Sequence, residues 1–183
     1  MAKIVAIANQ KGGVGKTTTT VNLSACIAQA GKRVLIVDID PQGNSSSGVG
    51  VDKDNTVYSI YDVLINRVDP KDAIIATMVP GLHVICSKIE LAGAEVELVS
   101  MMAREQVLLT LNALTSADTL LVPIQCEYYA LEGLSQLMNT IKLVQVNLNT
   151  ELCVEGVVLT MFDARTNLSS QVVAEVKKYF KNS

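Results

Sequence analysis

Short apolar runs alternate along the chain with segments whose apolar residues recur every three or four positions. Continuous apolar runs are typical of strands covered on both faces, and longer periodic segments are typical of helices packed on a sheet. The alternation predicts an α/β fold with a doubly wound, mainly parallel sheet and helices on both faces. We expect the strands at residues 3–8, 33–37, 82–86, 119–124 and 154–161.

The helix predictions differ in strength. One helix carries Leu134, Met138 and Ile141 at spacings of four and three, which places them on one face. Asn167 is a natural N-cap for the last helix, whose apolar stripe is expected to contain Leu168, Val172, Val176 and Tyr179. The clear helices are predicted at 16–30, 131–146 and 168–180, and weaker ones at 57–65 and 91–99.

Composition limits the classes of function. The 183 residues are 49% hydrophobic and 18% charged, which suits one ordinary globular domain. A net charge of -3, few aromatic residues and no long basic run disfavour a dedicated nucleic-acid surface. No apolar run reaches membrane-spanning length and no signal peptide is recognisable, so we expect a cytoplasmic protein. Its four cysteines form no C-x-x-C pair and are expected to be reduced and mostly packed.

The strongest chemical signal is a glycine-rich loop between the first strand and the first helix. It reads Lys11-Gly12-Gly13-Val14-Gly15-Lys16-Thr17-Thr18. Glycines let backbone N–H groups turn toward a phosphate, and a following helix directs its positive end at the anion. Lys16 adds a charge near the β- and γ-phosphates, and Thr17 offers a hydroxyl to Mg²⁺. The loop therefore predicts binding of ATP with magnesium.

This loop departs from the general pattern G-x-x-x-x-G-K-[ST]. The first glycine of that pattern would stand where this chain has Gln10, and an additional lysine, Lys11, opens the loop. The run of Thr17 to Thr20 is a poor choice for starting a helix on propensity alone. Hydroxyls directed at a nucleotide and its metal explain the first two threonines, whereas packing is the plainer explanation of the other two.

The loop, with the segments at 37–44, 91–95, 123–133 and 159–167, resembles the deviant Walker A ATPases of the ParA/MinD group. The likeness is strongest to ParA-type (Soj-like) chromosome and plasmid partition ATPases. It implies that Lys11 reaches the nucleotide of a facing subunit in an ATP-dependent homodimer. It also implies that Asp40 orients the attacking water and that Asp38 lies by the metal. The alternative for both aspartates is an ordinary strand-end turn, and we favour the functional roles.

One part of the family pattern is absent. Partition ATPases carry a strand that ends in a magnesium-site aspartate, and here the chain runs from residues 102–107 directly into 108–114. We therefore expect a single P-loop nucleotide-binding domain over residues 1–183, shortened near 107–109 and truncated at its C-terminus relative to the family. Either the working protein has residues that this sequence omits, or the polypeptide lacks the strand. We favour the first, because losing a central strand should exceed a typical stability of about 5–15 kcal/mol.

Three functions follow from this comparison. The first is a partition switch that hydrolyses ATP, acts with a ParB-type partner and non-specific DNA, and associates with the nucleoid, all by resemblance. The second is a nucleotide-binding regulator without turnover, which follows if the aspartate segment is truly missing. The third is a metal-cluster carrier or a membrane-bound relative. The cysteine spacing and the core-like stripe of the last helix disfavour it.

Overall fold

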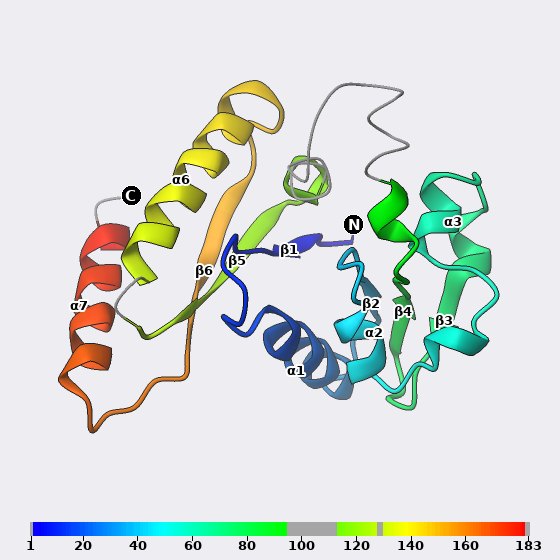
Figure 1. Cartoon of the computed structure of the whole chain (residues 1–183), viewed down its shortest axis with the longest axis horizontal. Helices are drawn as coiled ribbons and strands as arrows, with labels where there is room; N and C mark the ends of the chain where they lie inside the picture. Colours follow the sequence, from blue (N-terminus) through cyan, green and yellow to red (C-terminus); the bar gives the residue numbers. More distant parts are fainter. Residues whose placement is uncertain (1, 95–112, 128–129, 182–183) are drawn as a thin grey trace. The chain divides into compact units, whose positions relative to one another are not determined.

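The computed structural model describes residues 2–94, 113–127 and 130–181 (Figure 1). The chain divides into two compact units, Met1–Lys16 with Thr110–Ser183, and Thr17–Leu109. Strands alternate with helices in both, and three of the four strand pairings in the described residues are parallel. The predicted α/β class with mainly parallel strands is therefore confirmed.

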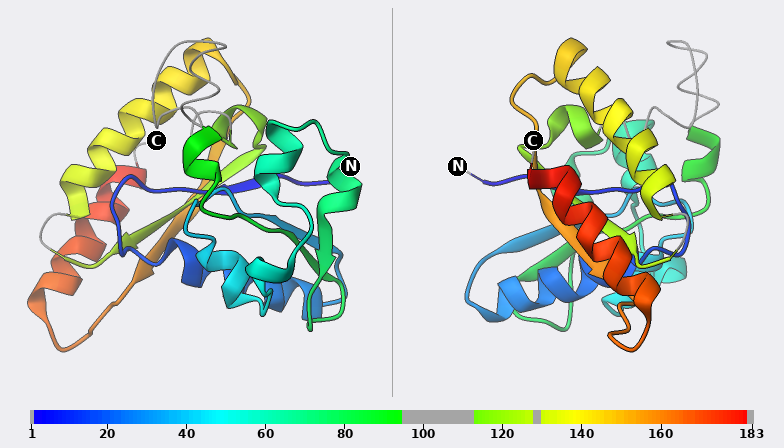
Figure 2. Two further views of the ribbon diagram at one scale, coloured as in Figure 1. Left: turned by 45° about the vertical axis from the view of Figure 1, so that its right-hand side comes forward. Right: turned by 90° about the vertical axis from the view of Figure 1, so that its left-hand side faces the viewer.

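The first unit contains a parallel sheet with the strand order β1-β5-β6. Its strands are β1 (Val5–Ile7), β5 (Thr119–Gln125) and β6 (Cys153–Thr160). Two helices, α6 (Ala130–Asn147) and α7 (Asn167–Lys181), follow β5 and β6 and contact each other (Figure 2). The central strand β5 is apolar from Leu120 to Ile124, as a parallel strand between two partners should be.

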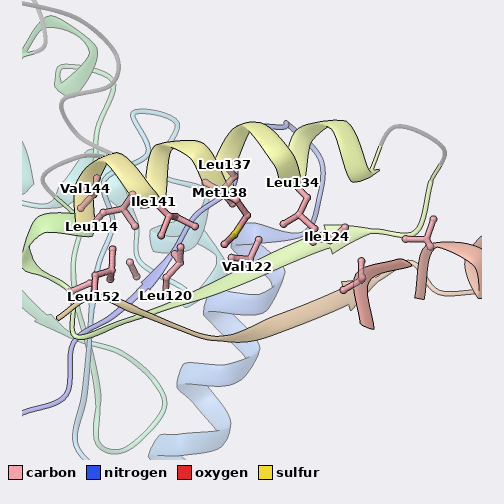
Figure 3. Packing of buried hydrophobic residues seen from close by; sticks show 14 of the residues in the cluster. Leu114, Leu120, Val122, Ile124, Leu134, Leu137, Met138, Ile141, Val144 and Leu152 are labelled. Carbon is pink, nitrogen blue, oxygen red and sulfur yellow. The ribbon is translucent and has the colours of Figure 1, made fainter. Parts of the chain in front are cut away.

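The core of this unit lies between α6 and β5. Figure 3 shows the apolar side chains of α6 directed at alternate residues of the strand. Leu134, Met138 and Ile141 are buried, which confirms the predicted stripe. Full burial of each such side chain is worth about 1.5–3 kcal/mol. The strand contributes Leu120, Val122 and Ile124, and α7 contributes Val172 and Val176.

The second unit contains the sheet β2-β4-β3. Strands β2 (Val34–Val37) and β4 (Leu82–Ile85) are parallel, whereas β3 (Ile74–Ala76) runs antiparallel to β4. Helix α1 (Lys16–Gln29) precedes β2. The connections contain the short helices α2 (Asn44–Gly48) and α3 (Ile60–Leu64) and the 3-10 turns Lys53–Asn55 and Pro70–Ala73.

Among the described residues the strands form two three-stranded sheets, with β1 at an edge of one and β2 at an edge of the other. Strand β3 was not predicted, because its three residues are too few to give a pattern. The shortening expected near 107–109 lies outside the described residues.

Several element boundaries need correction. The helix predicted at 57–65 starts only at Ile60, and in the helix predicted at 91–99 residues 91–94 are helical while the rest lies outside the described part. Asn167 is already inside α7, and the Thr166 hydroxyl accepts the N–H of Ser169 instead. Leu168 is exposed because it lies in the first turn of α7. The burial predicted for Tyr179 concerns a side chain that the structure does not describe.

The cysteines are less uniformly packed than expected. Cys86 and Cys126 are buried, whereas Cys26 and Cys153 are exposed, and all four are free thiols. Cys26 lies on α1, and Cys153 begins the edge strand β6. Burial raises the pKa of the Cys126 thiol, which makes that group a weak nucleophile at neutral pH.

Candidate functional site: a phosphate-binding loop

The loop between β1 and α1 depends on two glycines in the left-handed region. Gly13 has φ 73° and Gly15 has φ 88°, values that residues with a Cβ rarely adopt. A Cβ added to Gly15 would also lie 3.0 Å from Cγ2 of Thr160. At Gly12 and Gly13 an added Cβ would meet no atom within 4 Å, so the backbone there borders open space. The loop can therefore admit an anion close to its main chain.

Side chains outside the glycine run hold the loop in place. Asn9 donates from Nδ2 to the carbonyl of Pro123 at 2.7 Å, and its Oδ1 accepts the N–H of Lys11 at 3.0 Å. Val14 is buried, and its carbonyl accepts a hydrogen bond of 2.8 Å from the hydroxyl of Thr160. The loop is thus tied to the ends of β5 and β6, which organises it before any ligand arrives.

Two lysines occupy different places on the loop. Lys16 directs its ammonium across the loop and donates to the carbonyl of Lys11 at 2.9 Å. The Lys11 side chain is 36% exposed, and its Nζ lies 3.4 Å from Oε2 of Glu127. The other carboxylate oxygen of Glu127 accepts from the amide of Gln125. Lys16 is therefore placed for a ligand inside the loop, whereas Lys11 lies at its rim with only a weak exposed ion pair.

The first turn of α1 supplies hydroxyls beside the loop. Thr17 and Thr18 directly follow Lys16, with Thr17 half-buried and Thr18 exposed. The N–H groups in the first turn of a helix have no partner within the helix and carry a partial positive charge. Backbone donors, the Lys16 ammonium and the threonine hydroxyls are thus consecutive in the chain.

The two predicted aspartates belong to the other unit, at the end of β2. Asp38 is 4% exposed, and its Oδ2 accepts both the N–H and the hydroxyl of Ser46, at 2.8 and 2.7 Å. Asp40 is exposed, and its Oδ1 accepts the N–H of Gln42 at 3.0 Å. The structure therefore brings Asp38 together with Ser46. The roles of both aspartates toward a nucleotide stay predictions.

The loop residues fit a nucleoside triphosphate with magnesium. The open space at Gly12 and Gly13 admits a phosphate, and Lys16 supplies the compensating charge. In the described part of the chain no three His, Cys, Asp or Glu side chains form a metal-binding group. The hydroxyl of Thr17 is of the oxygen type that magnesium prefers.

Sequence reasoning missed the residues that support the loop. Asn9, Thr160, Glu127 and Ser46 were not singled out as functional. Thr160 could have been noticed, because it is a hydroxyl at the carboxyl end of a predicted parallel strand, where such folds place their ligand sites. The pairing of Glu127 with Lys11 gives no local signal, because 116 residues separate the two positions.

The chain passes from strand β1 through a glycine loop closed by a lysine into a helix that starts with threonines. This arrangement defines a P-loop nucleotide-binding protein. The model of the AAA domain family matches the chain in two pieces, residues 2–110 and 106–154. The chain belongs to this family and, within it, to the ParA-type chromosome-partitioning ATPases.

Two curated relatives carry that assignment. The sporulation initiation inhibitor protein Soj of Bacillus subtilis is 55% identical over 206 residues, covering 100% of this chain and 81% of the relative. The chromosome partitioning protein ParA of Myxococcus xanthus is 47% identical, covering 99% of this chain and 72% of the relative. The first alignment is longer than the 183 residues of this chain, so the relative has positions that face gaps here.

A solved structure agrees with the fold. It is named cobyrinic acid a,c-diamide synthase from Mycobacterium smegmatis, with bound ADP and magnesium. It is 37% identical, with a TM-score of 0.88, and the match covers 97% of this chain and 82% of that one. In the described part of this chain, no helix is both long and apolar enough to cross a bilayer.

Proposed function

We propose that this chain binds ATP with magnesium, hydrolyses it, and uses the cycle as a dimerisation switch in chromosome or plasmid partition. The observation that carries the proposal is the preformed loop, in which Lys16 already lies across the backbone at 2.9 Å from the carbonyl of Lys11. Such preorganisation lowers the cost of ordering a loop around a charged ligand.

Each part of the loop has a role in this proposal. The N–H groups of residues 12–15 and the ammonium of Lys16 hold the phosphates, while Val14 anchors the loop through its buried side chain. The hydroxyls of Thr17 and Thr18 face the metal and the phosphates. Magnesium supplies charge neutralisation when bound, and the protein supplies positioning. Asp40 would orient the water that attacks the γ-phosphate, and Asp38 would help to hold the metal.

The dimer part of the proposal rests on Lys11. Its ammonium is at the rim of the loop, and the ion pair with the 52% exposed Glu127 is of the kind usually worth less than about 1 kcal/mol. Lys11 can therefore leave Glu127 at little cost and reach a phosphate on a facing subunit, where a charge-assisted hydrogen bond is stronger. ATP, but not ADP, would then join two copies of the chain.

The wider setting is proposed from the relatives' names. The relatives from B. subtilis and M. xanthus are named for sporulation and chromosome partitioning. We infer a ParB-type protein as the partner that stimulates hydrolysis, non-specific DNA as the surface bound by the ATP form, and a nucleoid-associated place in the cytoplasm.

Three measurements on the purified chain test the proposal. Phosphate release from ATP with magnesium should be measurable, and light scattering should show a dimer with ATP that is absent with ADP. Lys11→Ala should still bind nucleotide but remain monomeric with ATP. A variant that dimerises as well as the parent would remove Lys11 from the interface.

A second candidate is a nucleotide-binding regulator that does not turn ATP over. It is supported by the family match, whose two pieces overlap at residues 106–110, and by the long alignment with the B. subtilis relative. Both agree with a missing segment that would hold the magnesium aspartate. Tight binding of ATP with no phosphate release, alone or with a ParB-type partner, would favour this candidate over the first.

A further inference from the structure

A buried hydrogen-bond network lies at the ends of β2 and β4, within one unit of the chain. Asp38 is 4% exposed and Ser46 is fully buried. Removing a carboxylate from water costs several kcal/mol unless hydrogen bonds compensate the charge. Asp38 accepts such bonds on both of its oxygens, two from Ser46 on Oδ2 and one from the N–H of Asp40 on Oδ1, at 3.2 Å.

The hydroxyl of Ser46 connects this carboxylate to the neighbouring strand. It donates its proton to Asp38 at 2.7 Å, and its oxygen accepts the N–H of Ser87, just beyond β4, at 3.2 Å. The N–H of Asp38 donates to the carbonyl of Ile85. The start of the segment that follows β2 is therefore fixed to β4 by the backbone and by one hydroxyl.

The segment fixed in this way is the turn that presents Asp40. The N–H of Asp40 is held by Asp38, its own Oδ1 accepts the N–H of Gln42, and its carbonyl accepts the N–H of Gly43 at 2.7 Å. From the other side, Lys53 donates to the carbonyl of Gln42 at 2.7 Å. The direction of the exposed Asp40 carboxylate is thus set by a turn whose first amide depends on Asp38.

We infer that Ser46 is a positioning residue for Asp40, acting through the buried carboxylate of Asp38. This inference rests on the proposed function, in which Asp40 orients the attacking water. Ser46 does not touch the nucleotide in this account. It fixes the carboxylate that holds the Asp40 amide, and a displacement of about 1 Å in a reacting geometry can cost a factor of about 100 in rate.

Ser46→Ala tests the inference, with Ser45→Ala as the matched control. Ser45 lies on the same short helix and is also buried, but it is not a donor to Asp38. In the nucleotide-free protein, NMR should show exchange of the Asp40 and Ser87 amide protons about tenfold faster in Ser46→Ala. The Ser87 N–H loses its acceptor, and Asp38, which holds the Asp40 N–H, loses the hydroxyl of Ser46. The turnover number for ATP should fall roughly tenfold, with the nucleotide dissociation constant unchanged. Ser45→Ala should change none of these.

The outcomes separate this inference from the proposed function. Unchanged exchange at Asp40 overturns it, and so does faster exchange with unchanged turnover. If Ser46→Ala does not fold, Asp38→Asn gives a second exchange measurement, because its single amide oxygen cannot replace both carboxylate oxygens that accept from Ser46 and from Asp40. A parent that binds ATP without turnover refutes the proposed hydrolysis and the catalytic part of this inference. The exchange rates then show by themselves whether the network holds the turn.

Discussion

The anchor of the phosphate loop on β6 can be removed with almost no change of shape. Thr160→Val replaces the hydroxyl that donates to the carbonyl of Val14 at 2.8 Å by a methyl group of similar size. The hydrogen bond is lost, and the carbonyl of Val14, a buried residue, is left without this donor. Such a loss is expected to cost about 1–2 kcal/mol.

If that cost falls on the binding-competent loop, the dissociation constant for ADP with magnesium should rise about five- to thirtyfold. The assay is isothermal titration calorimetry of the parent, Thr160→Val and the control Thr160→Ser. The serine variant keeps the hydroxyl but lacks the Cγ2 methyl that approaches Gly15. It should bind nearly as the parent does. Weaker binding by the serine variant than by the valine variant would show that packing, and not the hydrogen bond, holds the loop.

Two further predictions concern carboxylates. Glu127→Gln removes the charge that faces Lys11 at 3.4 Å, and should strengthen ATP-dependent dimerisation by up to about fivefold in sedimentation; weaker dimerisation would contradict it. Burial acts to raise the pKa of Asp62, but hydrogen bonds from Ser59 and Asn66 outweigh it and hold that pKa below its usual range. A carboxylate whose pKa is lowered by folding stabilises the fold at pH values above its unfolded-state pKa, and this stabilisation is lost as the pH falls through its folded-state pKa. Asp62→Asn should therefore lower the free energy of unfolding in urea by about 1 kcal/mol at pH 7. The difference should shrink below about pH 4, and an undiminished difference there would contradict the account.

The parallel strands and the long helices were predictable, because each carries its own pattern. The apolar run of β5 and the apolar stripe of α6 are each visible within a short stretch of sequence, and the residues in them are the ones that the fold buries. The phosphate loop was predictable for a similar reason, since glycines, lysines and threonines adjacent in sequence are also adjacent in space.

Elements held by distant partners were not predictable. Helix α2 consists of asparagine, three serines and glycine, all weak helix formers, and Asp38 holds it through Ser46. The start of α3 could have been found, because Ser59 and Asp62 have the spacing of a capping box. Thr160 has a local signal at the end of β6, but its bond to Val14 joins positions 146 residues apart, so the sequence does not indicate that partner.

The most direct test of the account is nucleotide binding by the loop itself. Titration of ADP with magnesium into the parent, Lys16→Ala and Lys32→Ala compares the lysine that crosses the loop with an exposed lysine beyond the end of α1. We predict about 100-fold weaker binding for Lys16→Ala, as expected when charge-assisted hydrogen bonds are lost, and unchanged binding for Lys32→Ala. Equal affinities in all three proteins would contradict the assignment of this loop as the nucleotide site.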